Sequence, residues 1–241
     1  MKQPRLVLLP LLLLLLALSF SPKRAHASAS TITLQLYMET LCPYCANATV
    51  NLAPIVRHAV LGPLLRIEYV PWGNAKEQPD ASSPPSADTG IQCQHGPAEC
   101  ALNTLLSCAI ALQPSWFDFA LCLEQAVLEG ADRSTRAIAD RCAPSPVATA
   151  ALVACAEGPL GRALSRMAAA RTAALDPPHE YVPWIVLNGV PLRSASDNLL
   201  AFVCVALDPA SRAAARDVCR DPVVEEEQEE AQQQQQMVAT S

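Results

Sequence analysis

The sequence lacks a cluster of basic residues. Its 241 residues include 17 Lys and Arg against 23 Asp and Glu, a net charge of −6. Proteins that bind nucleic acid neutralise phosphates with grouped Lys and Arg side chains, so nucleic acid is not expected as a partner. Charged residues make up only 17% of the chain and hydrophobic residues 51%, which is enough apolar material for a sizeable buried core.

A second long apolar run is also missing. The one run, Leu6–Phe20, spans about fifteen residues, short of the roughly 20 that a transmembrane helix needs. Two basic residues precede it and Ala25-His26-Ala27 follows it, which is the order of a secretory signal peptide. We therefore predict that residues 1–27 are cleaved off, with a cut after Ala29 as the second choice and a retained anchor as the alternative. The mature chain is expected in the secretory pathway, without stable membrane insertion.

Only Cys42 and Cys45 have CxxC spacing. A zinc site built on CxxC needs a second ligand pair, which the sequence does not offer at that spacing, so no metal is expected. All ten cysteines follow the expected signal, and an even number in an oxidising compartment predicts a disulfide framework. Eight cysteines allow roughly a hundred connectivities, among which we favour only the local pair Cys204–Cys219. The eight expected to form structural disulfides are Cys93, Cys100, Cys108, Cys122, Cys142, Cys155, Cys204 and Cys219.

The CxxC motif lies between a strand pattern and a helix pattern. Thr31–Met38 alternates apolar and polar residues, and helical spacing follows from Pro43 to about Val60, with Pro54 expected to kink or break the helix. Cys42 then occupies the N-cap, and Pro43 the first helical position, where its missing N–H costs nothing. Free N–H groups and the helix dipole stabilise a thiolate there. We expect the pKa of Cys42 to lie well below the ~8.5 of a free thiol.

This arrangement predicts a redox dithiol. Cys42 would attack a substrate disulfide, and Cys45, one turn later and more deeply buried, would resolve the mixed disulfide. No cofactor is expected. Alternatively, Cys42 and Cys45 could be half of a zinc site or form a purely structural disulfide.

The remaining patterns predict a thioredoxin-like α/β fold. A second strand at residues 64–70 completes a β-α-β unit, and residues 71–90 have the composition of a long loop. Four or five helices are expected within an insertion at about 93–172, joined by helix-to-helix disulfides. A strand at 182–187, the turn Asn188-Gly189, an edge strand containing Pro191 and a helix at 196–207 would follow. The domain would cover residues 28–220, before a disordered Glu/Gln-rich tail at 221–241.

Four further positions are candidates. The Val182-Pro183 bond is expected to be cis and to leave backbone groups beside the CxxC free for substrate, although an ordinary trans proline would also open an edge strand. His95 could assist proton transfer, or make only a structural hydrogen bond. Glu39 could modulate the thiols or be a solvated charge. Asn47 begins a glycosylation sequon on the redox helix.

Several strings together resemble the gamma-interferon-inducible lysosomal thiol reductase family, over roughly residues 31–220. They are the sequence LYMETL followed by Cys42-Pro43-Tyr44-Cys45, the segment Pro71-Trp72-Gly73-Asn74-Ala75, the string Cys93-Gln94-His95-Gly96-Pro97-Ala98-Glu99-Cys100 with Asn103 and Cys108, and the stretch from Tyr181 to Gly189. The string that begins at Cys93 is far more specific than CxxC alone, but its role does not follow from the residues.

The resemblance implies an enzyme that reduces protein disulfides, often in an acidic, lysosome-like compartment, with Cys42 as nucleophile and Cys45 as resolving thiol. Disulfide-containing proteins would be its substrates and a small thiol its reductant. Its location would be a lysosome, a vacuole or the extracellular space. A secretory-pathway disulfide oxidase or isomerase is one alternative, because the same fold runs in either direction. A non-catalytic, cysteine-rich helical binding or storage protein is the other.

Overall fold

The computed structural model describes residues 31–77, 90–193 and 198–219. The expected signal peptide at 1–27 and the expected disordered tail at 221–241 lie outside the described residues. Residues 78–89, most of the loop expected at 71–90, lie outside them as well.

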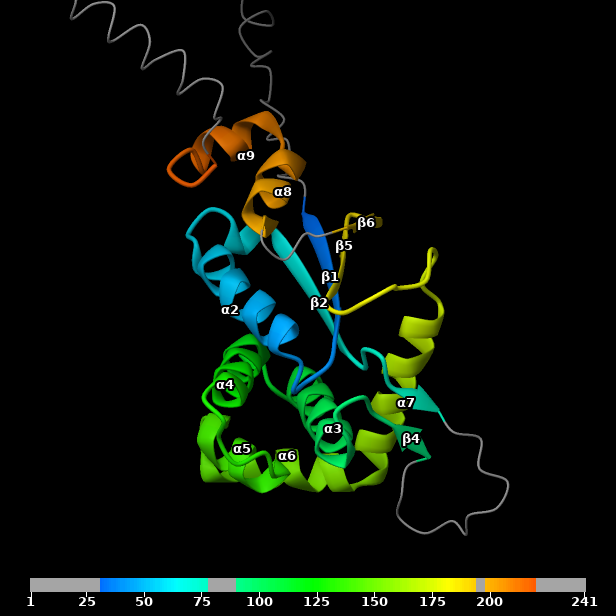
Figure 1. Cartoon of the computed structure of the whole chain (residues 1–241). Coiled ribbons are helices and arrows are strands. Elements are labelled where there is room, and N and C mark those ends of the chain that lie inside the picture. The colour runs from blue at the N-terminus through cyan, green and yellow to red at the C-terminus, as the bar shows by residue number, and fades with distance from the viewer. Residues whose placement is uncertain (1–30, 78–89, 194–197, 220–241) are drawn as a thin grey trace, which may run out of the picture.

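A four-stranded mixed sheet forms the centre of the molecule (Figure 1). β1 (Ile32–Met38) pairs in parallel with β2 (Leu65–Pro71) and antiparallel with β5 (Trp184–Leu187), which pairs antiparallel with β6 (Val190–Leu192). The order β2-β1-β5-β6 places β6, with its proline, at an edge as predicted. Asn188 and Gly189 both have positive φ, 49° and 81°, as the tight turn between β5 and β6 requires.

The two faces of the sheet contact different helices because side chains alternate along each strand. Leu34, Leu36 and Met38 face the larger core, which includes residues of α2 (Pro43–Arg57). Tyr37 and Trp184 face a smaller core that includes alanines of α7 (Pro159–Ala173). The sheet is thus covered on both faces, and each fully buried large apolar side chain contributes about 1.5–3 kcal/mol.

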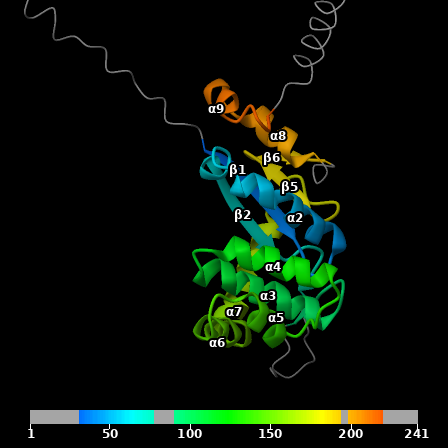
Figure 2. The same cartoon turned by 90° about the vertical axis from the view of Figure 1, so that its left-hand side faces the viewer.

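Five helices between β4 (Ile91–Gln92) and β5 form the predicted insertion, which lies at one end of the sheet (Figures 1 and 2). They are α3 (Pro97–Leu112), α4 (Trp116–Leu128), α5 (Thr135–Cys142), α6 (Pro146–Glu157) and α7. Disulfides join Cys108 of α3 to Cys155 of α6 and Cys122 of α4 to Cys142 of α5. The expectation that all three insertion disulfides join helices is wrong for the third, Cys93–Cys100, because Cys93 lies in the loop before α3.

Other departures concern short elements. α2 runs through Pro54 to Arg57, so the expected break is wrong: the proline falls in the last turn, where few hydrogen bonds remain to be lost. A 3₁₀ turn, Gly62–Leu64, leads into β2, and β3 (Lys76–Glu77), which lies inside the expected loop, pairs with β4 directly after it. The closing helix α8 (Leu199–Ala206) is followed by α9 (Pro209–Ala214), and Cys204–Cys219 ties this end together as predicted.

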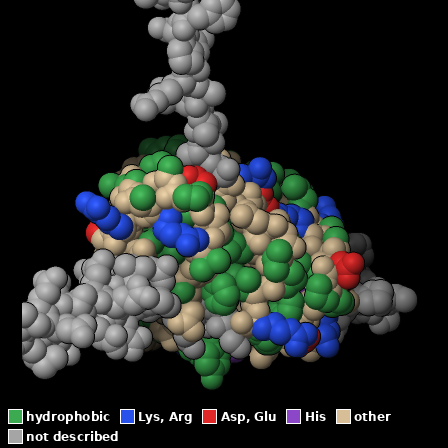
Figure 3. All heavy atoms as spheres, turned by 90° about the horizontal axis from the view of Figure 1, so that it is seen from above, with side chains coloured by type: hydrophobic (Ala, Val, Ile, Leu, Met, Phe, Trp, Pro, Cys, Tyr) green, Lys and Arg blue, Asp and Glu red, His purple; other side chains and the backbone are tan. Residues whose placement is uncertain are grey.

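The far end of the molecule, around α8 and α9, has apolar side chains interspersed with basic ones (Figure 3), which in this segment are Arg212 and Arg216. Val205 of α8 is 72% exposed. Within the described residues, no single helix has the length and apolar character to span a membrane; α6 and α7 meet the criterion only jointly, across a 66° bend.

Candidate functional site

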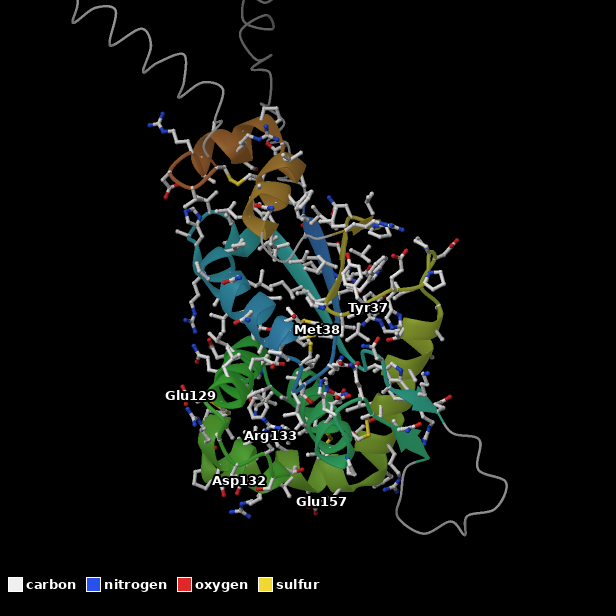
Figure 4. The ribbon with its side chains drawn as sticks, viewed as in Figure 1. Tyr37, Met38, Glu129, Asp132, Arg133 and Glu157 are labelled. Atoms are coloured by element: carbon white, nitrogen blue, oxygen red, sulfur yellow. A yellow bond between two sulfur atoms is a disulfide. The ribbon has the colours of Figure 1, made fainter. Side chains whose placement is uncertain are left out.

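The CxxC motif begins α2 directly after β1. Leu41 turns the chain with a φ of 68°, an unusual value for a bulky residue, and Cys42 is the N-cap with an extended backbone. Pro43 occupies the first turn, and the carbonyl of Cys42 accepts the N–H of Ala46 at 3.0 Å. The first N–H groups of the helix therefore point toward the sulfur of Cys42. Met38 of β1 marks this region in Figure 4, beside the start of α2 and at the insertion end of the sheet.

The two thiols differ in environment. A hydrogen bond from the Cys45 side chain is the main cause that lowers the pKa of Cys42 to about 6; the N–H groups of Cys45 and Tyr44 and the charge of His95 act in the same direction, against burial. Burial in turn raises the pKa of Cys45 well above its usual range. Cys42 is 5% exposed and Cys45 fully buried. The pair thus has one nearly buried thiol that ionises easily at the start of the helix and one protonated thiol behind it.

The string that begins at Cys93 positions the turn before Cys42. Thr40 donates its backbone N–H (2.8 Å) and its hydroxyl (2.9 Å) to Oδ1 of Asn103, and the hydroxyl also lies 3.2 Å from the carbonyl of Glu99. Asn103 and Glu99 belong to α3 and are buried. The first helix of the insertion, α3, therefore holds Thr40 in place, two positions before Cys42. Positioning this turn is a structural role for the string that its sequence alone does not reveal.

A second part of the same string places His95 between two carboxylates. Its backbone N–H donates to Oε2 of Glu99 at 2.8 Å, its Nδ1 contacts the same oxygen, and Oε1 of Glu39 lies 3.7 Å from Nδ1. Glu39 is 1% exposed, so the expectation of a solvated charge at this position is wrong. Burial, helped by the negative charges of Glu99 and Cys42 and opposed by a hydrogen bond from Asn74, raises the pKa of Glu39 to about 7.

The segment after β2 completes the pocket around Glu39. The N–H of Asn74 donates to Oε2 of Glu39 at 2.8 Å. Gly73 has a φ of +60°, and a Cβ there would lie 2.4 Å from the same oxygen and 2.5 Å from Cβ of Glu39. Only glycine combines that backbone with that contact.

The Val182–Pro183 bond is cis, as predicted. Because Tyr37 is the partner of Trp184 in the sheet, continuing the register places Pro183 beside Met38, next to the turn that leads to the CxxC. Tyr44, between the two cysteines, is 72% exposed, and Tyr181 is 38% exposed and packs on Trp184. One exposed aromatic ring therefore lies between the two cysteines, and another lies just before the cis-proline.

A buried polar chain behind Cys45 escaped the sequence analysis. The Thr49 hydroxyl bonds to the carbonyl of Cys45 at 3.0 Å and to the hydroxyl of Tyr69 at 2.7 Å, and Tyr69 donates to Glu124 at 3.4 Å. Glu124 lies on α4, and burial raises its pKa to about 8. The sequence of α4 reads as that of an apolar helix, and nothing in its pattern indicated that Glu124 would lie behind Cys45.

The structure brings Cys42, Cys45, Val182 and Pro183 together, with Glu39 and His95 beside them. Asn47 lies on the exposed side of α2, while its sequon partner Thr49 is buried. The eight other cysteines are paired in four disulfides, which leaves Cys42 and Cys45 as the free thiols of the described chain.

Comparison with known proteins agrees with this geometry. Residues 33–146 match the family model described as gamma interferon inducible lysosomal thiol reductase. The chain is 34% identical over 179 residues to the gamma-interferon-responsive lysosomal thiol protein of Arabidopsis thaliana, covering 72% of this chain and 70% of that one. It is 37% identical to the gamma-interferon-inducible lysosomal thiol reductase of Carassius auratus, covering 71% and 67%.

A solved structure supports the fold. The thiol-disulfide oxidoreductase MdbA of Corynebacterium diphtheriae aligns with a TM-score of 0.50 at 13% identity, over 74% of this chain and 86% of that one. This likeness confirms the predicted thioredoxin-like architecture with its helical insertion. From the family match, the two relatives and the shared motif strings, the chain belongs to the gamma-interferon-inducible lysosomal thiol reductase family.

Proposed function

We propose that this chain reduces disulfide bonds in protein substrates with Cys42 as nucleophile and Cys45 as resolving thiol. The observation that carries the proposal is the asymmetry of the two thiols at the start of α2. The N-cap thiol has a pKa of about 6, while its neighbour one turn later is fully buried and protonated.

The reaction proceeds in two exchanges. The thiolate of Cys42 attacks one sulfur of the substrate disulfide, which forms a mixed disulfide and releases the first substrate thiolate. Cys45 then loses its proton and attacks Sγ of Cys42, which closes the Cys42–Cys45 disulfide and releases the second substrate thiolate. Two electrons have passed to the substrate, and two molecules of a small thiol restore the dithiol as they are oxidised to their own disulfide.

The surroundings of the site suit a polypeptide substrate. The cis bond before Pro183 leaves the backbone of Val182 at the end of β5, beside the turn that carries Cys42. Tyr44 and Tyr181 offer exposed rings on either side. An extended chain would bond to the free backbone groups while its side chains contact these rings.

The test is reduction of a fluorescent protein disulfide at acidic and at neutral pH. We expect Cys42→Ser to abolish turnover and Cys45→Ser to accumulate a mixed disulfide that denaturing gels detect without reductant. The double variant Cys204→Ser/Cys219→Ser removes a bridge at the opposite end and should keep the activity. Turnover that survives in Cys42→Ser would leave the proposal without its nucleophile.

The direction of electron transfer is a separate question, because the same dithiol could act as an oxidase or isomerase. We propose net reduction, following the names of the relatives. Equilibration with glutathione buffers tests this: a reductase should remain largely oxidised in buffers that reduce a disulfide oxidase. A potential as high as that of a strong oxidant would favour the alternative.

The proposed place of action is an acidic endolysosomal or vacuolar compartment, with the extracellular space as the other candidate. A pKa near 6 at Cys42 supports it, because a thiol of ordinary pKa would have almost no thiolate in acid. Imaging of the tagged full chain against an acid-compartment dye should show overlap, and the same chain without residues 1–27 should remain in the cytosol.

A further inference from the structure

Three potential metal-ligand side chains converge beside the nucleophile. One ligand atom from each of Glu39, His95 and Glu99 can be chosen so that all three lie within 4.8 Å of one another. They come from the turn after β1, the loop closed by the Cys93–Cys100 disulfide, and the first turn of α3. These supports are rigid, so the three groups are held together before any ligand arrives.

The carboxyl oxygens of this cluster are not all satisfied. Glu39 and Glu99 are 1% and 0% exposed, yet only one imidazole lies between them. Oε1 of each carboxylate is buried without a hydrogen-bond partner among the described residues, and that of Glu39 lies 3.7 Å from Nδ1 of His95. Buried carboxylate oxygens are costly unless they are paired or coordinate a cation, so the cluster has unused capacity for a positive ligand.

We propose that Glu39, His95 and Glu99 bind a zinc ion, and that the bound ion restrains Cys42 and slows the reductase. One imidazole and two carboxylates are a three-ligand set that zinc accepts in open, tetrahedral sites. Calcium would need six to eight oxygens, which three side chains do not provide. The inhibition, unlike the binding, rests on the proposed role of Cys42.

The spacing of the ligand atoms fits this ion after small movements. Zinc bonds of about 2.0–2.2 Å in a tetrahedron place donor atoms about 3.3–3.6 Å apart. The 3.7 Å between Glu39 and His95 is close to that range, and His95 has only to give up its contact with Glu99. The His95 side chain is 33% exposed, which gives the ion a path from solvent.

The fourth position of such a site would be next to the reactive thiol. Cys42 is close enough for its charge to act on Glu39, and for the charge of His95 to act on Cys42. A thiolate is a strong zinc ligand. An ion held by the three side chains would therefore attract the Cys42 thiolate and make it a weaker nucleophile. The Cys42 sulfur does not lie within 4.8 Å of all three ligand atoms, so a direct bond to zinc would require Cys42 to move. This site does not use the CxxC spacing, so no motif indicates it.

Binding is tested apart from activity, on full-length protein carrying Cys42→Ser and Cys45→Ser so that the dithiol cannot chelate the ion. Titration calorimetry with Zn²⁺ should show one site, and His95→Gln and Glu99→Gln should each weaken it about 10–100-fold. Matched controls away from the cluster, at the partly buried His58 (His58→Gln) and the exposed Glu129 (Glu129→Gln), should leave it unchanged. Because His95 is partly exposed, its variant should fold even if Glu99→Gln does not, and circular dichroism checks both.

Inhibition is tested with the thiols intact. Zn²⁺ should slow wild-type turnover reversibly, with recovery on adding EDTA, and His95→Gln should need at least tenfold more zinc for the same fractional loss of its own activity. No calorimetric binding, or binding that the His95 and Glu99 variants leave unchanged, would overturn the site. Equal zinc sensitivity of His95→Gln would show that zinc acts through the dithiol alone.

Discussion

At the scale of single residues, the proposed chemistry depends on the low pKa of Cys42. A cysteine followed directly by proline predicts an N-cap thiol from local chain geometry alone, and a lowered pKa follows from the helix N-terminus. The largest contribution, however, is the hydrogen bond from Cys45. The approach of His95 depends on a loop more than fifty residues away, a tertiary contact with no local signal.

This assignment predicts the pH profile of alkylation. The Cys42 thiolate forms as pH rises through its pKa, so the iodoacetamide rate should rise through about pH 6 and level off above it. Cys45→Ser keeps a hydroxyl donor and should shift the midpoint little, whereas Cys45→Ala removes the donor and should raise it. A midpoint near the ~8.5 of a free thiol in the wild type would refute the assignment.

At the scale of elements, the sequence patterns identified the strands and the helices of the insertion but not how they meet at the site. Period-2 alternation in β1 and the Asn188-Gly189 turn are local signals, and both were predicted correctly. The two-residue pairing of β3 with β4 and the short helix α9 have too few residues for any periodicity. That α3 clamps Thr40, and that the segment after β2 holds Glu39, are contacts between distant parts of the chain.

The contact of the β2–β3 segment with the site can be tested by Gly73→Ala. The new Cβ would overlap Glu39 at 2.4–2.5 Å, so the carboxylate or the segment must move. We expect a loss of about 2–4 kcal/mol in the free energy of unfolding, measured in denaturant, together with slower turnover. Gly189→Ala is the matched control: its φ is also positive, +81°, but no atom lies within 4 Å of the added Cβ.

The free energy of unfolding of Gly189→Ala should therefore fall only by the cost of a Cβ at positive φ, about 1–2 kcal/mol, and its turnover should be unchanged. The difference between the two variants isolates the contact with Glu39. Equal losses of stability and equal turnover would mean that Gly73 matters for its φ alone.

At the scale of the whole molecule, the helical insertion contributes to the site as well as to the core. It supplies His95 and Glu99 at the front of the thiols and Glu124 behind them. Composition and spacing predicted that such a block exists and carries six cysteines. They did not predict that it closes over the start of α2, because helix packing depends on faces that a sequence rich in alanine and leucine does not mark.

Glu124 makes the stability of the whole molecule depend on pH. Burial raises its pKa in the folded chain to about 8 from the usual 4.5, so the folded state holds this proton more tightly than the unfolded state does. The contribution to stability is therefore full in acid and is lost as pH rises from about 4.5 to about 8. Over that range the free energy of unfolding falls by up to about 1.4 kcal/mol per pH unit.

We expect the free energy of unfolding in urea to fall from acidic to neutral pH in the wild type, and to fall less steeply in Glu124→Gln, whose neutral amide has no proton to lose. The surface variant Glu129→Gln removes the same charge where the side chain is 59% exposed, and it should keep the wild-type slope. If Glu124→Gln also keeps that slope, the buried carboxyl does not govern the acid stability. If the slope flattens as expected, this side chain of the insertion contributes to the stability of the fold under the acidic conditions in which the low pKa of Cys42 is most useful.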